Sequence, residues 1–161
     1  MRIGASLAGK PFGRVQLDVA PRPYEVEVTD MLDLPSTLRF AGVPDVRFEV
    51  IDRHRHAAEK FHAMLRDFGD RENSRVRDLV DLVLLVELDL LDVGKLRAAL
   101  AQVWAERESR APSTELPPLP SSWPARYELV AAELDLATSS FVDAQVILAG
   151  LWAEAMALNA S

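Results

Sequence analysis

The chain of 161 residues contains no cysteine, so disulfide bonds and thiolate metal sites are excluded. It also contains no apolar run approaching the roughly 18 residues that a membrane-spanning helix needs. The stretch after Met1 soon reaches Lys10 and Pro11 and is too short to hold the apolar region of a signal peptide. Together these absences predict a soluble protein of the cytoplasm, a compartment in which disulfides are rare.

Acidic residues are absent from residues 1–17, although the whole chain carries a net charge of −7. The charge is also uneven further along. From Arg53 to Arg77 there are seven Arg or Lys against four Asp or Glu, a local balance of +3, and all three histidines lie in this segment. A basic segment in an acidic protein indicates a local anion site rather than a broad nucleic-acid surface. The alternative is that exposed helices commonly carry such charges.

The hydrophobic content of 49% suits one globular domain, and the residue patterns predict an α+β fold. Residues 1–51 are expected to form short strands of an incomplete sheet. Period-two alternation predicts strands at residues 14–19, 24–28 and 47–51, each bounded by proline or glycine signals. Three short strands need helices or further strands to cover them.

A helical bundle is expected to follow the strands. Residues 52–110 read as three helices, residues 111–123 as a proline-rich linker and residues 124–161 as two C-terminal helices. In the last helix, large apolar residues at near-helical spacing indicate a core face rather than a stack for a ligand. These residues are Phe141, Leu148, Trp152 and Met156.

The first two helices of this region differ in character. The first has an apolar stripe of Ala57, Phe61, Met64, Leu65 and Phe68, and Gly69 supplies a stop signal. The second, residues 76–88, is apolar on nearly every side, as buried helices are. Asp92 is expected to cap the third helix.

Asp78 and Asp81 lie three residues apart, on one side of the apolar second helix. Carboxylates in such a helix are costly unless they are paired or bind something. For Asp81 the alternative is an ordinary ion pair with Arg77, four residues before it. Arg75 and Arg77 give the helix a basic start that could clamp phosphates.

Two further patterns invite a functional interpretation and do not support one. The segment from Gly4 to Lys10 has the spacing of a phosphate loop, but it lacks the preceding strand and following helix, and Pro11 occupies the place of the Ser or Thr. His54, His56 and His62 are spaced so that their side chains would point in different directions on a helix, which does not favour a zinc site.

Two segments carry a resemblance to a known family. They are A-E-K-F-H-A at residues 58–63 and R-V-R-D-L-V-D-L at residues 75–82, and F-G-R-V-Q-L-D-V at residues 12–19 adds to them. These segments resemble the AbiEii/AbiGii-type nucleotidyltransferases, the toxins of bacterial type IV toxin–antitoxin systems, which have a polymerase-beta-like nucleotidyltransferase fold. The resemblance extends over nearly the whole chain and matches the C-terminal part of the family's fold.

The resemblance implies roles for several residues, and Arg75 and Arg77, from the basic start of the second helix, could bind phosphates beside them. Lys60 would contact the phosphates of a nucleoside triphosphate (NTP). Asp78, with Asp81 as the alternative, would be the catalytic or metal-linked carboxylate, and Asp18 a further metal-binding carboxylate on a strand. It also implies Mg²⁺ as cofactor, an RNA acceptor such as a transfer RNA (tRNA), and an antitoxin as partner protein.

One element of the family pattern is not found in these residues. The family carries a strand with a D-x-D-like acidic pair, and residues 1–17 hold no acidic residue. The expectation is therefore that this chain, as it stands, lacks the N-terminal metal-binding motif and does not transfer nucleotides alone. The alternative interpretation is a non-catalytic interaction or nucleotide-binding module that docks an antitoxin-like partner.

Overall fold

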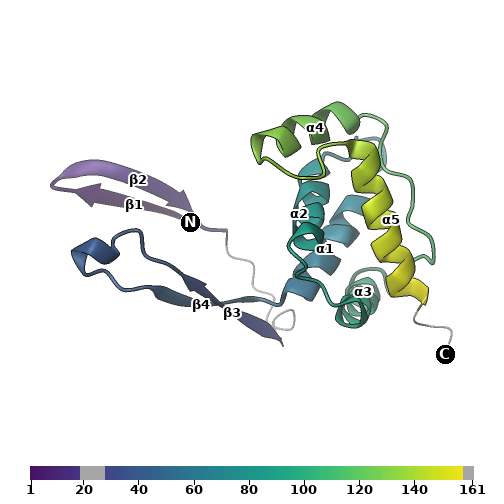
Figure 1. Ribbon diagram of the computed structural model, residues 1–161, viewed down its shortest axis with the longest axis horizontal. Coiled ribbons are helices and arrows are strands. Elements are labelled where there is room, and N and C mark those ends of the chain that lie inside the picture. The colour runs from purple at the N-terminus through teal and green to yellow at the C-terminus, as the bar shows by residue number, and fades with distance from the viewer. Residues whose placement is uncertain (19–27, 158–161) are drawn as a thin grey trace.

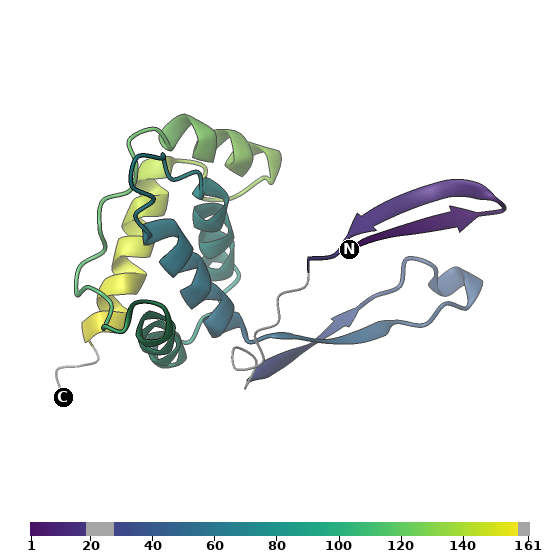
Figure 2. The same ribbon diagram turned by 180° about the vertical axis from the view of Figure 1, so that it is seen from behind.

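The computed structural model describes residues 1–18 and 28–157, and their fold is α+β, as the sequence predicts. Two β-hairpins lie beside one another and project from a bundle of helices (Figure 1). Figure 2 shows from behind that the second hairpin leads directly into the first helix of the bundle. None of the helices in the described ranges is long and apolar enough to cross a membrane.

The first hairpin consists of β1 (Arg2–Leu7) and β2 (Lys10–Gln16), which pair antiparallel. Its turn is made by Ala8 (φ 49°) and Gly9 (φ 74°), and two successive positive φ values are typical of a tight hairpin turn. The segment with phosphate-loop spacing is therefore a hairpin and has no helix after its loop. The strand predicted at residues 14–19 begins earlier than predicted and ends at Gln16, and β1 was not predicted.

The second hairpin consists of β3 (Thr29–Leu34) and β4 (Val46–Ile51), joined by a loop that contains the short 3-10 helix η2 (Arg39–Ala41). The strand predicted at residues 47–51 is confirmed. The strand predicted at residues 24–28 lies almost entirely outside the described residues.

The bundle contains the five helices that the periodicity predicts, with small changes at their ends. Asp92 caps the third of them as expected, because its carboxylate accepts a hydrogen bond of 2.8 Å from the backbone N–H of Lys95. The helices are α1 (Arg53–Leu65), α2 (Val76–Glu87), α3 (Val93–Glu108), α4 (Pro124–Glu133) and α5 (Phe141–Ala157).

Helix α1 ends at Leu65, so the prediction that Phe68 continues its stripe is wrong. Polar side chains beyond the helix explain the early end. The amide of Asn73 donates to the carbonyl oxygen of Met64 at 2.7 Å. The carboxylate of Asp67 accepts from the backbone N–H of Gly69 at 2.8 Å, which turns the chain out of the helix.

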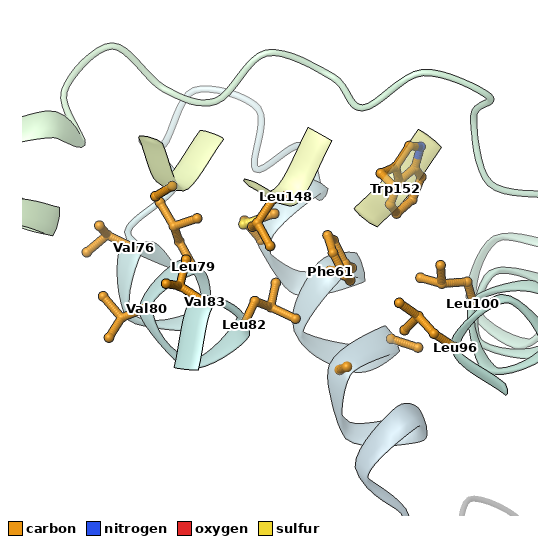
Figure 3. Packing of buried hydrophobic residues seen from close by; sticks show 14 of the residues in the cluster. Phe61, Val76, Leu79, Val80, Leu82, Val83, Leu96, Leu100, Leu148 and Trp152 are labelled. Carbon is orange, nitrogen blue, oxygen red and sulfur yellow. The ribbon is translucent and has the colours of Figure 1, made fainter. Parts of the chain in front are cut away.

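The hydrophobic core lies between all five helices, with Tyr127 and Ala131 as the fully buried residues of α4. Phe61 of α1 has Leu82 of α2 on one side and Leu100 of α3 on the other (Figure 3). The Phe61 ring also packs against Trp152 of α5, with ring centroids 5.2 Å apart. Trp152 and Leu148 are 1% and 0% exposed, so the prediction that this face of α5 belongs to the core is confirmed.

Residues 111–123 contain no helix or strand and run across the bundle from α3 to α4. The indole Nε1 of Trp152 donates to the carbonyl oxygen of Ser113 at 3.1 Å. At the other end of the segment, the buried indole of Trp123 donates to the carbonyl oxygen of Asn73 at 2.7 Å. The segment is therefore attached to the loop between α1 and α2, which carries Arg71 and leads to the start of α2.

Candidate functional site

The packing of α1 against α2 brings Lys60 to both aspartates of the second motif. The Nζ atom of Lys60 lies 3.3 Å from Oδ1 of Asp78 and 2.5 Å from Oδ2 of Asp81. Asp81 thus pairs with Lys60 and not with Arg77, its expected alternative partner. The two segments that carry the family resemblance form one charged cluster.

Burial distinguishes the members of this cluster. The side chains of Lys60 and Asp78 are each 14% exposed, whereas that of Asp81 is 45% exposed and lies at the rim. A charge so far removed from water needs a partner of opposite sign, which Lys60 and Asp78 give each other. The Oδ2 atom of Asp78 is buried and has no hydrogen-bond partner among the described residues. The guanidinium of Arg75 lies 3.7 Å from this oxygen, and its side chain is 55% exposed.

A hollow of about 470 Å³ adjoins this cluster at the start of α2. Three guanidinium groups and two carboxylates border it, so its surroundings carry an excess of one positive charge. The positive end of the α2 dipole adds to the attraction for an anion. The lining residues are Phe68, Arg71, Glu72, Ser74, Arg75, Arg77 and Asp78.

The three arginines of the hollow differ in whether they form an ion pair with another described residue. Arg75 faces Asp78, whereas no ion pair of Arg71 or Arg77 with another described residue is found. Glu72 is oriented towards the α4 side, where its carboxylate accepts from the hydroxyl of Ser122. Two guanidinium groups therefore remain available for an anionic ligand. Arg71 was not selected from the sequence, although it lies within the basic segment from Arg53 to Arg77.

The loop that carries these arginines is held in place by Asn73. The side-chain nitrogen of Asn73 donates to the end of α1, and its side-chain oxygen accepts from the backbone N–H of Arg75 at 2.9 Å. Its own carbonyl oxygen accepts from the indole of Trp123. Since the loop is fixed from both sides, the guanidinium groups start from a defined backbone position, which lowers the entropic cost of binding.

His56 lies on α1 one turn before Lys60. His56 keeps an exposed surface, but the protein around it still lowers its pKa by desolvation. The ammonium of Lys60 lowers the pKa further, and the carboxylates of Asp81, Asp78 and Glu59 oppose this shift. His56 is therefore neutral near pH 7 and adds no positive charge to the cluster.

The three histidines do not converge on one point. His54 lies 3.2 Å from Oδ2 of Asp52 through Nδ1 and accepts from the backbone N–H of Asp92 through Nε2. His62 lies 3.0 Å from Oε1 of Glu108. Each of these two has its own partner on a different part of the bundle.

Asp18 is not part of the charged cluster. It directly follows β2, at the base of the first hairpin, and its exposed carboxylate accepts a hydrogen bond of 3.3 Å from Gln16. Within residues 1–18 and 28–157, no three His, Asp or Glu side chains are grouped so that they could hold a metal ion. The point between Asp78 and Asp81 is filled by the ammonium of Lys60. These residues therefore do not fit a magnesium site of their own in this arrangement.

Comparison with protein families gives a match that covers nearly the whole chain. The model of a family described as "Nucleotidyl transferase AbiEii toxin, Type IV TA system" matches residues 1–158. No curated protein matches the sequence. Both helices that build the charged cluster lie within the matched range.

Proposed function

Because the chain belongs to the AbiEii family of nucleotidyl transferase toxins from type IV toxin–antitoxin systems, we propose that it binds an NTP at the start of α2 and takes part in nucleotide transfer to an RNA acceptor. A tRNA end is the acceptor that the resemblance implies. The observation that supports the proposal is the position of Lys60 and Asp78 beside the arginine-lined hollow.

In nucleotidyl transfer, a hydroxyl oxygen of the acceptor attacks the α-phosphorus of the NTP, its proton is removed, and pyrophosphate leaves. The triphosphate carries several negative charges, so groups that hold it must be cationic and fixed in position. Arg71, Arg75 and Arg77 suit this role because a guanidinium can bind two phosphate oxygens at once. Lys60 does not line the hollow but contacts Asp78, which does, and it would add a compact charge there when a ligand displaces Asp81.

Asp78 would then have two roles. One oxygen keeps Lys60 oriented, and the buried Oδ2 becomes accessible when phosphate oxygens draw Arg75 away from it. A buried carboxylate oxygen without a hydrogen bond is costly, and a ligand that supplies a donor there would be favoured. The magnesium ion that the resemblance implies, together with the role of Asp18 as its ligand, stays a prediction.

The alternative function is a nucleotide-binding or interaction module without catalysis that docks an antitoxin-like partner. This alternative needs no metal ion, whereas the resemblance implies metal-assisted chemistry for the transferase. Both functions require the hollow to bind an anion.

Titration calorimetry of the whole chain with each of the four common NTPs tests the binding step. Replacing Arg71 or Arg77 by Ala should weaken binding by about 1–3 kcal/mol, the range for a charge-assisted hydrogen bond. Arg47→Ala, which removes an exposed arginine of β4, is the matched control and should leave the isotherm unchanged. Equal affinities for Arg71→Ala, Arg77→Ala and the parent chain would show that the NTP does not bind in this hollow.

A labelling experiment then separates the two functions. The chain is incubated with labelled NTP, Mg²⁺ and total tRNA, and parallel titrations are run with and without Mg²⁺. Labelled RNA that disappears in Lys60→Ala, but not in Lys95→Ala, supports the transferase. Binding of NTP without labelling supports the module.

A further inference from the structure

Large apolar side chains are exposed mainly on the two hairpins rather than on the bundle. Isolated two-stranded sheets are marginally stable in water, and contiguous exposed apolar patches commonly mark interaction sites. The exposed apolar residues of the hairpins and the loops around them are Met1, Ile3, Phe12, Val15, Leu17, Val28, Met31, Leu32, Leu34, Leu38, Phe40, Val43, Val46, Phe48 and Ile51.

The second hairpin has one apolar and one polar face. Leu32 lies opposite Phe48, and Leu34 lies opposite Val46, so these four side chains share one face. They are 51%, 46%, 53% and 46% exposed, which means that no other part of the described chain covers them.

The opposite face of the second hairpin holds three of the four charged residues of its two strands; the fourth, Asp30, lies on the apolar face and pairs with Arg53 at 2.9 Å. On the opposite face Asp33 forms an ion pair of 3.3 Å with Arg47, and Thr29 donates to Glu49 at 2.6 Å. The segregation of charged from apolar side chains is the pattern of a sheet with one buried face.

The first hairpin shows the same division. Ile3 lies opposite Val15, and Leu17 follows two residues after Val15 on the same side. These three side chains are 46%, 59% and 40% exposed. Arg2 and Arg14 lie on the other face. Both hairpins therefore present an uncovered apolar face, and each carries most of its charges on the opposite side.

The two hairpins differ in charge. Residues 1–17 contain three basic residues and no acidic one, a balance of +3. Residues 29–51 contain four acidic and two basic residues, a balance of −2. Most of these charges lie on the faces that point away from the proposed contact, so they act across the thickness of the sheets. Contact between a first and a second hairpin would bring together segments of opposite net charge, whereas contact between two second hairpins would bring together segments of like charge.

We propose that two copies of this chain associate by reciprocal exchange of hairpin contacts. The apolar face of the first hairpin (Ile3, Val15, Leu17) of one copy packs against the apolar face of the second hairpin (Leu32, Leu34, Val46, Phe48) of the other copy. The same contact is made in the reverse direction. Each copy contributes one first hairpin and one second hairpin to the two contacts. The assembly therefore closes as a dimer and leaves no apolar hairpin face exposed. Two sheet faces pack in this way at a separation of about 10 Å.

The hairpins project away from the bundle, so substitutions on them leave its core intact and can be tested without unfolding the helices (Figure 1). Leu32→Ser removes a side chain from the apolar face. Met31→Ser removes the adjacent side chain from the opposite face and is a matched control, since the two residues are 51% and 52% exposed. Sedimentation velocity should give a dimer for the parent chain and for Met31→Ser. For Leu32→Ser, the dimer should dissociate at a concentration at least ten times higher.

Cysteine cross-linking identifies the contact itself, because the natural chain contains no cysteine. Val15→Cys and Phe48→Cys are prepared as separate proteins, mixed and oxidised. A disulfide-linked dimer in the mixture, in excess of that from either protein alone, is the expected result.

Three outcomes would overturn the proposal. The parent chain could be a monomer at every concentration tested. Phe48→Cys could cross-link to itself as efficiently as to Val15→Cys. A chain with both substitutions could form an internal disulfide at high dilution, which would show that the two faces pack within one copy.

Discussion

The ammonium of Lys60 lies closer to Asp81 than to Asp78, at 2.5 Å against 3.3 Å. The residue at the rim of the cluster therefore holds the lysine more closely than the buried one does. A phosphate that binds Lys60 must compete first with Asp81. Asp81, for which the sequence favoured a structural role, is thus placed to regulate access to Lys60.

The first prediction concerns this competition. Asp81→Asn removes one of two carboxylates from Lys60 and should strengthen NTP binding about tenfold, equivalent to about 1.4 kcal/mol. The change in the free energy of unfolding should stay within about 1 kcal/mol, because Asp81 is partly exposed. Calorimetry and urea unfolding measure the two effects. Weaker NTP binding in Asp81→Asn would mean that this carboxylate helps to hold the ligand.

The second prediction concerns the buried pair. Lys60→Ala leaves the carboxylate of Asp78 buried without its ammonium and should lower the free energy of unfolding by about 1–3 kcal/mol. Adding Asp78→Asn in the same chain should recover part of this loss, since the amide carries no charge. Urea unfolding of both single variants and the double variant measures the coupling. Additive losses would show that Lys60 does not stabilise Asp78.

The helices could be predicted because their signals are local. Apolar periodicity, the cap at Asp92 and the prolines near residue 120 all act within one or two turns of chain. The end of α1 could not be predicted, because it depends on Asn73, eight residues beyond Leu65. β1 and β3 were not predicted, because their alternation of apolar and polar residues is interrupted. Gly4 and Ala5 weaken it in β1, and Met31 next to Leu32 breaks it in β3.

The site was only partly predictable for a related reason. Lys60 and Asp78 belong to recognisable segments, and the structure brings them together. Arg71 reaches the hollow only because the loop turns back at Gly69, whose φ is 61°. Which carboxylate binds Lys60 more closely depends on how α1 crosses α2. No spacing along the chain encodes that angle.

The third prediction concerns pH. Burial lowers the pKa of His62, and Glu108 partly opposes this shift. Desolvation lowers the pKa of His56, and the positive charge of Lys60 lowers it further. The folded state therefore binds protons less readily than the unfolded state, whose histidines titrate near 6.5. Below about pH 6.5 the unfolded state takes up more protons, so stability falls as the pH falls.

Thermal melting between pH 5 and pH 8 measures this effect. The melting temperature should be nearly constant above about pH 7 and should decrease below about pH 6.5. In His56→Gln the decrease over this interval should be smaller, since one of the two groups no longer titrates. A profile of His56→Gln that is parallel to the parent profile would show that His56 does not contribute.

The last prediction concerns the core of α2. Leu82 is 0% exposed and lies beside Phe61, so Leu82→Asp places a charge where no partner can reach it (Figure 3). The cost is several kcal/mol, which is comparable to about half of the stability of a typical domain. Leu88→Asp is the matched control, because Leu88 follows the same helix and is 62% exposed. Circular dichroism should show loss of cooperative melting for Leu82→Asp and a nearly unchanged melting temperature for Leu88→Asp. Equal melting of both variants would mean that α2 is not packed against α1, and Lys60 would then have no fixed position beside Asp78.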